Sequence, residues 1–306
     1  MTTTAPAWIF FDVGWTLVDE TPALLHYFEG VRAAMPNPGV TTARDLYARY
    51  KLAIREDAAD PRARVLEEAG LPGGDWKRFG WDYGRVRPYR DAGPALRALR
   101  GVIRLGVVAN QGPGLPERLD RWGFGGLFDL VLGSGDCGVK KPSPEIFALA
   151  AERAGSPSAS LMMAGDRLDN DIDPAKRAGW QTAWVRRGDH GKLKPRDPAG
   201  TPDCIVPNLV RLAELFVPAD RIRLAEQVDA AGAIVAWPEK EREKRLVLEY
   251  LSTRFEAGRV YSEAEVNRII DAHHRFGDYA LLRRELVDRG YLARDDDGRR
   301  YRRTAG

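Results

Sequence analysis

A single carboxylate stands at the end of a strongly apolar segment near the start of the chain. Asp12 closes the run 7–11, Ala-Trp-Ile-Phe-Phe, and Gly14 follows two positions later. Such a run is typical of a buried parallel strand, and open α/β sheets bind their ligands where such strands end. A carboxylate at this place can attack phosphorus or bind a metal ion, although an ordinary turn aspartate after a core strand would show the same pattern.

Three later segments place further polar side chains in a similar context. Asn110 follows the apolar run 105–109, Lys141 stands shortly before an expected helix, and Asp166 follows the apolar run 161–165. Short apolar runs and helical stretches alternate over about the first two thirds of the chain, and this alternation predicts βαβ units around a parallel sheet. The polar residues therefore stand close to expected strand ends, where such sheets bind ligands.

Taken in order, these four segments resemble the motifs of the haloacid dehalogenase (HAD) superfamily of phosphohydrolases. The resemblance covers about the first two thirds of the chain, to near Phe216. It implies an α/β fold in which a doubly wound parallel sheet forms the middle of three layers. The core of this fold would comprise residues 1–19 and 88–217.

Residues 20–87 interrupt the alternation of strands and helices. They are rich in Ala, Leu, Arg and aromatic residues, and they contain a helix start near Thr41. By resemblance, this segment is the helical cap that many members of the superfamily insert after the first motif. A cap closes over the active site, excludes water and selects the substrate.

The resemblance implies a role for each motif residue. Asp12 would be the nucleophile, and its carboxylate would form an aspartyl-phosphate that water then hydrolyses. Lys141 would neutralise the charges of the nucleophile and of the phosphoryl oxygens. A Mg²⁺ ion would be bound, because hard oxygen ligands suit that ion. Its ligands would be Asp12, the backbone carbonyl of Gly14 and Asp166, with support from Asp171 through water or a more distant contact.

Four further residues are expected at the substrate. Asn110, with its side chain and its backbone N–H, and Thr16 would hold the phosphate group. Ala109 stands where the superfamily usually carries a Ser or Thr, so one phosphate contact is missing there. Trp15 would lie near the mouth of the site, where an amphipathic aromatic residue can either form a wall of the substrate pocket or pack beneath the cap.

The first motif departs from the superfamily pattern at Gly14. Phosphatases of the superfamily usually carry a second aspartate there, which protonates the leaving oxygen and later activates water. General acid–base catalysis contributes about 10²–10⁴-fold. Its loss would slow the reaction without abolishing it, and would favour substrates with good leaving groups. His26 in the cap is one candidate replacement.

Two other reactions of the superfamily do not need that aspartate. Dehalogenases use the nucleophilic aspartate without a metal, and phosphonatases use a lysine of the cap to form a Schiff base. Asp166 and Asp171 together favour a metal site and therefore a phosphatase, with the other two reactions as minor alternatives.

The last part of the chain carries a different pattern. Helical stretches are expected over residues 244–255, 262–273 and 279–289. A hairpin with an Asp297-Gly298 turn follows them. This is the order of elements in a winged helix, so we expect a small α+β, winged-helix-like domain over residues 218–306. The segments 261–267 and 282–292 also resemble a small bacterial domain family of unknown function.

Composition narrows the range of partners. The chain has 306 residues, a net charge of +3 and two cysteines, which do not point to a polyanionic partner or a disulfide scaffold. From Val217 onward, 18 Lys and Arg stand against 17 Asp and Glu. Arginines crowd the last helix and the hairpin, so this domain could bind nucleic acid. The small net charge favours a protein contact, such as a homodimer, instead.

The sequence also bears on where the protein acts. No run approaches the roughly 18–20 apolar residues that span a bilayer, and the first residues lack the basic segment of a signal peptide. We therefore expect a cytoplasmic protein with no membrane partner.

Two functions are compatible with these observations. The leading interpretation is a Mg²⁺-dependent, HAD-like phosphatase that hydrolyses a small phosphorylated metabolite. The alternative is a catalytically weakened HAD sensor domain fused to a nucleic-acid- or protein-binding regulatory module. Gly14, Ala109 and the C-terminal module favour the alternative, whereas Asp12, Lys141 and Asp166 favour turnover.

Overall fold

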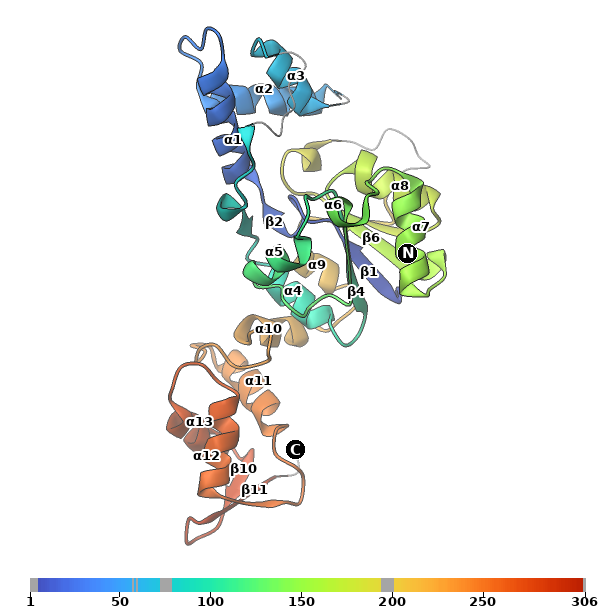
Figure 1. The fold of residues 1–306 in the computed structure, drawn as a ribbon. Coiled ribbons are helices and arrows are strands. Elements are labelled where there is room, and N and C mark those ends of the chain that lie inside the picture. Colours follow the sequence, from blue (N-terminus) through green and yellow to red (C-terminus); the bar gives the residue numbers. More distant parts are fainter. Residues whose placement is uncertain (1–4, 57, 59, 72–78, 194–200, 305–306) are drawn as a thin grey trace. The chain divides into compact units, whose positions relative to one another are not determined.

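The computed structural model describes residues 5–56, 58, 60–71, 79–193 and 201–304. The chain divides into two compact units, Met1–Leu215 and Phe216–Gly306 (Figure 1). Each unit has a hydrophobic core of its own.

The first unit is built on a six-stranded sheet in which every neighbouring pair of strands is parallel. Its strands are β1 (Trp8–Phe11), β4 (Arg104–Ala109), β5 (Leu130–Gly133), β6 (Leu161–Gly165), β7 (Gln181–Val185) and β8 (Cys204–Val206). They lie in the order β5-β4-β1-β6-β7-β8. The chain therefore winds away from β1 in both directions, which confirms the doubly wound α/β fold expected from the sequence.

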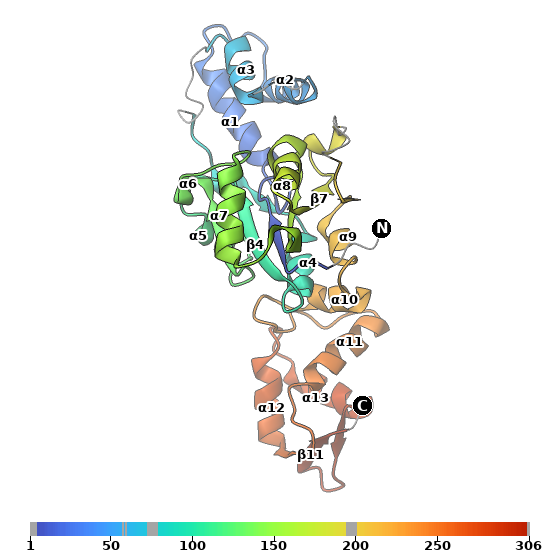
Figure 2. The ribbon, with the colours of Figure 1, turned by 90° about the vertical axis from the view of Figure 1, so that its right-hand side faces the viewer.

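Helices cover both faces of this sheet, which makes three layers. Trp8 and Phe10 of β1 point to one face and pack against Phe147 of α7 (Pro144–Ala154) and Ala175 of α8 (Asp173–Arg177). On the other face, α4 (Ala92–Leu99) and α9 (Leu209–Ala213) pack against each other. Figure 2 shows α7 and the pair α4 and α9 on opposite sides of the sheet. Two shorter helices, α5 (Leu115–Arg121) and α6 (Ser134–Cys137), lie beside β5.

A helical segment is inserted between two short strands that follow β1. These strands, β2 (Val18–Asp19) and β3 (Arg87–Pro88), form an antiparallel pair. The segment contains α1 (Thr21–Ala34), α2 (Ala43–Arg55), α3 (Pro61–Glu68) and the short 3-10 helix η2 (Tyr83–Arg85). Thr42 and Asp45 form a capping box at the start of α2. Leu24, Phe28 and Leu46 are among the residues of the buried cluster that joins these helices.

The second unit combines four helices with a small sheet. The helices are α10 (Ala219–Gln227), α11 (Glu241–Ser252), α12 (Glu263–Ala272) and α13 (Tyr279–Asp288). The antiparallel sheet has the order β10 (Leu292–Arg294), β11 (Arg300–Arg303), β9 (Val260–Ser262). Leu251, Tyr261, Leu282 and Tyr301 are fully buried in its core. From α11 onward, the elements follow the order expected from the sequence.

Among the described residues, no helix is both long and apolar enough to span a membrane.

Candidate active site

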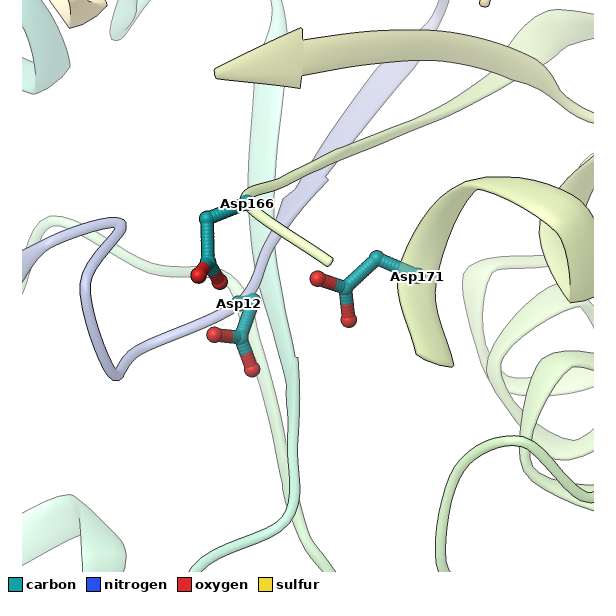
Figure 3. Close-up of side chains that lie close together, drawn as sticks. All are labelled: Asp12, Asp166 and Asp171. Carbon is teal, nitrogen blue, oxygen red and sulfur yellow. The ribbon is translucent and has the colours of Figure 1, made fainter. Parts of the chain in front are cut away.

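The structure brings three carboxylates together at the carboxyl edge of the sheet. Phe11 of β1 lies level with Ala164 of β6, so Asp12 and Asp166, which follow these strands, leave the sheet side by side. Asp171 comes from η4 (Leu168–Ile172), a single π-helical turn. The three side chains point toward one another (Figure 3), and each offers an oxygen that lies within 4.8 Å of the others.

Lys141 connects two of these carboxylates. Its Nζ donates to Asp12 Oδ1 at 2.7 Å and to Asp171 Oδ1 at 2.6 Å, and its side chain is only 1% exposed. Burial alone would lower the pKa of Lys141, but the negative charges of Asp12 and Asp171 raise it. The lysine is therefore held in its charged form between the two carboxylates.

Asn110 fixes the backbone of Lys141. Its Nδ2 donates to the Lys141 carbonyl at 2.8 Å, and its Oδ1 accepts from the Lys141 N–H at 2.8 Å. This two-point contact joins the loop after β4 to the segment before α7. Sequence reasoning placed the Asn110 side chain on the phosphate and missed its contact with Lys141, because the two residues lie 31 positions apart.

Asp171 packs directly against the backbone at the end of β6. A Cβ atom on Gly165 would lie 2.3 Å from Asp171 Oδ2, so only glycine admits the carboxylate here. The N–H of Arg167 donates to the same oxygen at 3.0 Å. The neighbouring Asp169 instead pairs with Arg167 at the surface, and its side chain is 60% exposed.

Asp166 has the most unusual environment of the three acids. Both of its carboxylate oxygens are buried, and neither has a hydrogen-bond partner among the described residues. Burial, reinforced by the charges of Asp171 and Asp12, raises the pKa of Asp166 well above its usual value. Buried polar groups normally have partners, and a cation between the three carboxylates would give Asp166 one. The residues present therefore fit a hard divalent cation with oxygen ligands.

Trp15 and Thr16 occupy the turn after Asp12. Trp15 adopts a left-handed backbone conformation, with φ of 51°, and its ring packs in the cap cluster with Leu24 and Tyr27. The indole N–H donates to Thr21 Oγ1 at 3.4 Å. Of the two roles expected for Trp15, these contacts support packing beneath the cap.

Two other expected substrate contacts are buried. Thr16 is fully buried, and its hydroxyl has no hydrogen-bond partner among the described residues. Ala109 is fully buried at the end of β4, and only its backbone could meet a phosphate.

The cap and the core touch on the side of α2. The hydroxyl of Tyr47 in α2 donates to Asp189 Oδ2 at 2.7 Å. His26, the expected candidate for the missing acid, lies on the exposed side of α1 and pairs with Glu29 at 3.4 Å. It takes no part in the carboxylate cluster.

Sequence reasoning missed Glu20. It immediately precedes α1, is only 5% exposed, and accepts a hydrogen bond from Gln111 Nε2 at 2.9 Å. Burial raises the pKa of its carboxyl, an effect that the charge of Arg62 and the bond from Gln111 oppose. The only signal in the sequence is an acid between an expected strand and a helix, and many surface residues share that pattern.

Comparison with known proteins identifies two families along the chain. The family described as HAD-hydrolase-like matches residues 138–212. The family described as an uncharacterised protein conserved in bacteria (DUF2087) matches residues 233–303. The second match corresponds to the domain family of unknown function that the sequence resembled.

Individual relatives extend the first match. The glyceraldehyde 3-phosphate phosphatase of Methanopyrus kandleri is 34% identical over 160 residues, which are 50% of this chain and 65% of the relative, slightly less than two thirds. The 5-amino-6-(5-phospho-D-ribitylamino)uracil phosphatase YigB of Escherichia coli is 30% identical over 229 residues, which are 67% of this chain and 94% of the relative.

A solved structure shares the fold of the first unit. The HAD-hydrolase YfnB of Bacillus subtilis has 22% sequence identity and a TM-score of 0.55, over 70% of this chain and 99% of that chain. The motif order, the doubly wound sheet and the match to nearly the full length of YigB agree with one another. The chain therefore belongs to the haloacid dehalogenase superfamily of hydrolases.

Proposed function

We propose that this protein is a magnesium-dependent phosphatase that hydrolyses a small phosphorylated metabolite through an aspartyl-phosphate on Asp12. One observation carries the proposal: Asp12, Asp166 and Asp171 converge within 4.8 Å around the charged Lys141. Nucleophilic catalysis by a carboxylate needs such positive charge nearby, because the carboxylate must approach an anionic phosphoryl group.

Exposure selects Asp12 as the nucleophile. Its side chain is 14% exposed, whereas that of Asp171 is 1% exposed and Asp166 is equally buried. A substrate can therefore reach Asp12 and not the other two. Lys141 binds Asp12 Oδ1, which leaves Oδ2 to attack phosphorus.

The reaction follows from this arrangement in two displacements. Asp12 forms a bond to phosphorus while the alcohol of the substrate leaves, and water then attacks the same phosphorus and frees the carboxylate. Lys141 holds Asp12 in place and neutralises charge during both steps. Mg²⁺, held by Asp12, the backbone carbonyl of Gly14 and Asp166 with support from Asp171, would supply further positive charge to the phosphoryl oxygens.

The relatives support this class of substrate. The two curated relatives described above are named as phosphatases of two different small phosphorylated molecules. The activities for which they are named share the hydrolysis of a phosphate ester and differ in the organic part of the substrate. A dehalogenase is less well supported. The oxygens of Asp166 are buried without a partner in the described part of the chain, and they suit a metal that dehalogenases do not use.

The regulatory alternative rests on Gly14, on Ala109 and on the second unit as its binding module. Some of its arginines, however, are paired with acids: Arg283 binds Glu263 at 2.7 Å and Arg289 binds Glu241 at 2.8 Å. Paired arginines offer little free charge to phosphates. Nucleic-acid binding is therefore not favoured, and a protein contact, such as a homodimer, is the better candidate for this unit.

The test is phosphate release from aryl, acyl and alkyl phosphates by the full chain. We expect release that requires Mg²⁺ and disappears in Asp12→Asn, which keeps the shape of the side chain and removes the nucleophile. Asp169→Asn is the matched control, because it removes a nearby carboxylate outside the cluster. Release that persists in Asp12→Asn, or in excess chelator, would contradict the proposal.

A further inference from the structure

The carboxyl group of Glu20 lies against Gly14. A Cβ atom on Gly14 would lie 2.8 Å from Glu20 Cδ, 2.8 Å from Oε2 and 3.0 Å from Oε1. All three atoms of the carboxyl group therefore crowd the space into which a side chain at position 14 would extend.

Position 14 is where phosphatases of the superfamily usually carry their second aspartate. The carboxyl carbon of an aspartate lies one C–C bond, about 1.5 Å, beyond its Cβ. The carboxyl groups of such an aspartate and of Glu20 would thus compete for one small volume. Glycine at position 14 leaves that volume to Glu20.

The position of Glu20 is fixed from the other side of the site. Gln111 Nε2 donates to Glu20 Oε1 at 2.9 Å, and Gln111 directly follows Asn110, the residue that holds Lys141. The carboxyl group thus lies between the loop after β1, which carries Asp12, and the loop after β4. The bond from Gln111 occupies Oε1, and Oε2 lies beside Gly14, 2.8 Å from where a Cβ atom there would stand.

We propose that Glu20 is the general acid and base of this enzyme, in place of the aspartate absent at Gly14. This inference rests on the proposed phosphatase function. In the first step, Glu20 gives its proton to the leaving oxygen as the bond from that oxygen to phosphorus breaks and the Asp12–phosphorus bond forms. In the second step, the Glu20 carboxylate takes a proton from water as the water oxygen bonds to phosphorus and Asp12 leaves.

The variant Glu20→Gln separates this role from a structural one. It keeps the size of the side chain and an oxygen for Gln111 to bind, but it can neither give nor take the proton. We expect kcat/KM for an alkyl phosphate to fall by about 10²–10⁴-fold. The fall should be much smaller for 4-nitrophenyl phosphate, whose leaving group needs little protonation.

A second readout concerns the intermediate. Because Glu20→Gln also lacks the base that activates water, the aspartyl-phosphate should accumulate on Asp12. We expect a rapid burst of about one 4-nitrophenol per enzyme before slow turnover, and the double variant Asp12→Asn/Glu20→Gln should show none. A merely structural role for Glu20 would produce no such burst.

The exchange variant Gly14→Asp/Glu20→Ala tests the shared volume. It should hydrolyse alkyl phosphates faster than Glu20→Ala alone, because the aspartate at position 14 places a carboxyl group in the volume that Glu20 occupied. Glu29→Gln is the control, since Glu29 lies in α1, the helix that Glu20 immediately precedes, with its side chain 68% exposed. This variant should behave as the unmodified protein.

The outcomes separate this inference from the function on which it rests. Loss that is equal for alkyl and aryl phosphates, or no loss in Glu20→Gln, would overturn the role of Glu20 while Asp12-dependent activity stands. An unmodified protein that releases no phosphate from any ester would overturn both.

Discussion

The metal-free site is expected to lower the stability of the first unit, and Asp166→Asn tests this. Both oxygens of Asp166 are buried and have no hydrogen-bond partner among the residues that the structure describes, and they lie beside the carboxylates of Asp12 and Asp171. Folding must either bury this charge or protonate it, and both cost free energy. The amide in Asp166→Asn is neutral and can donate to the neighbouring carboxylates.

The magnitude follows from the cost of an unsatisfied buried group. Such a group costs about 1–3 kcal/mol, and more when it is charged. In a unit of this size each kcal/mol shifts the melting temperature by about 2–4 °C. In excess chelator, Asp166→Asn should therefore melt about 2–12 °C above the unmodified protein.

Magnesium should reverse this order. A ligand at 100 times its dissociation constant stabilises the folded state by about 2.7 kcal/mol, and only the unmodified protein has the complete set of carboxylates. Scanning calorimetry, with and without Mg²⁺, measures the transition that responds to the ion. Asp169→Asn should show no gain in chelator, because Asp169 is exposed and paired with Arg167. If Asp166→Asn melts below the unmodified protein in chelator, or gains as much from Mg²⁺, the reasoning is wrong.

Three further changes should act on stability in different ways. Lys141→Met leaves Asp12 and Asp171 without their buried counter-charge, so urea titration should show a loss of about 3–5 kcal/mol, and phosphate release should stop. Burial, aided by the charge of Arg167, lowers the pKa of His190 to about 4 in the folded state. Below the ordinary pKa of about 6.5 the unfolded state therefore binds more protons than the folded state, and the protein becomes less stable as the pH is lowered. The loss between pH 7.5 and pH 5 should be about 2 kcal/mol, and His190→Gln should lack it. Leu251→Ala would leave a cavity in the core of the second unit. Calorimetry should show that the unfolding free energy of that unit alone falls by about 2–5 kcal/mol.

Much of the first unit could be predicted because its signals are local. The apolar runs that become β1, β4 and β6 each end in a polar residue, and parallel strands bring their ends to one edge of the sheet. This places Asp12, Asn110 and Asp166 at one edge of the sheet, and the resemblance to the superfamily implied that Asp12 and Asp166 share a site there. The second unit was predictable for a similar reason, since Ser262 and Glu265 mark a helix start by their spacing alone.

The contacts that the sequence could not predict join distant segments. Asn110 binds the backbone of Lys141, and Gln111 binds Glu20 across 91 positions. Neither contact follows from periodicity, because each depends on how a loop is folded against another element. Glu20 was missed for this reason, whereas exposed His26 was considered because its residue type is common in acid–base catalysis.

The proposed role of Glu20 changes the meaning of Gly14. The motif alone indicates that the catalytic aspartate is missing at position 14, and that an aspartate placed there should raise the activity. In the structure, the chemistry depends on where a carboxyl group lies, and a side chain from position 20 reaches that place. A Cβ on Gly14 would lie 2.8 Å from Glu20 Oε2, so Gly14→Asp alone must displace Glu20 and sets two negative groups against each other.

We therefore expect Gly14→Asp to lower phosphate release from alkyl esters, and removal of the Glu20 carboxyl in the same chain to restore it. Steady-state rates of the two single variants and the double variant measure this coupling directly. If Gly14→Asp instead raises the rate with Glu20 intact, the space beside Gly14 can hold both carboxyl groups. Glu20 would then be no substitute for the missing aspartate, and the glycine would be the reason for any weakness of this enzyme.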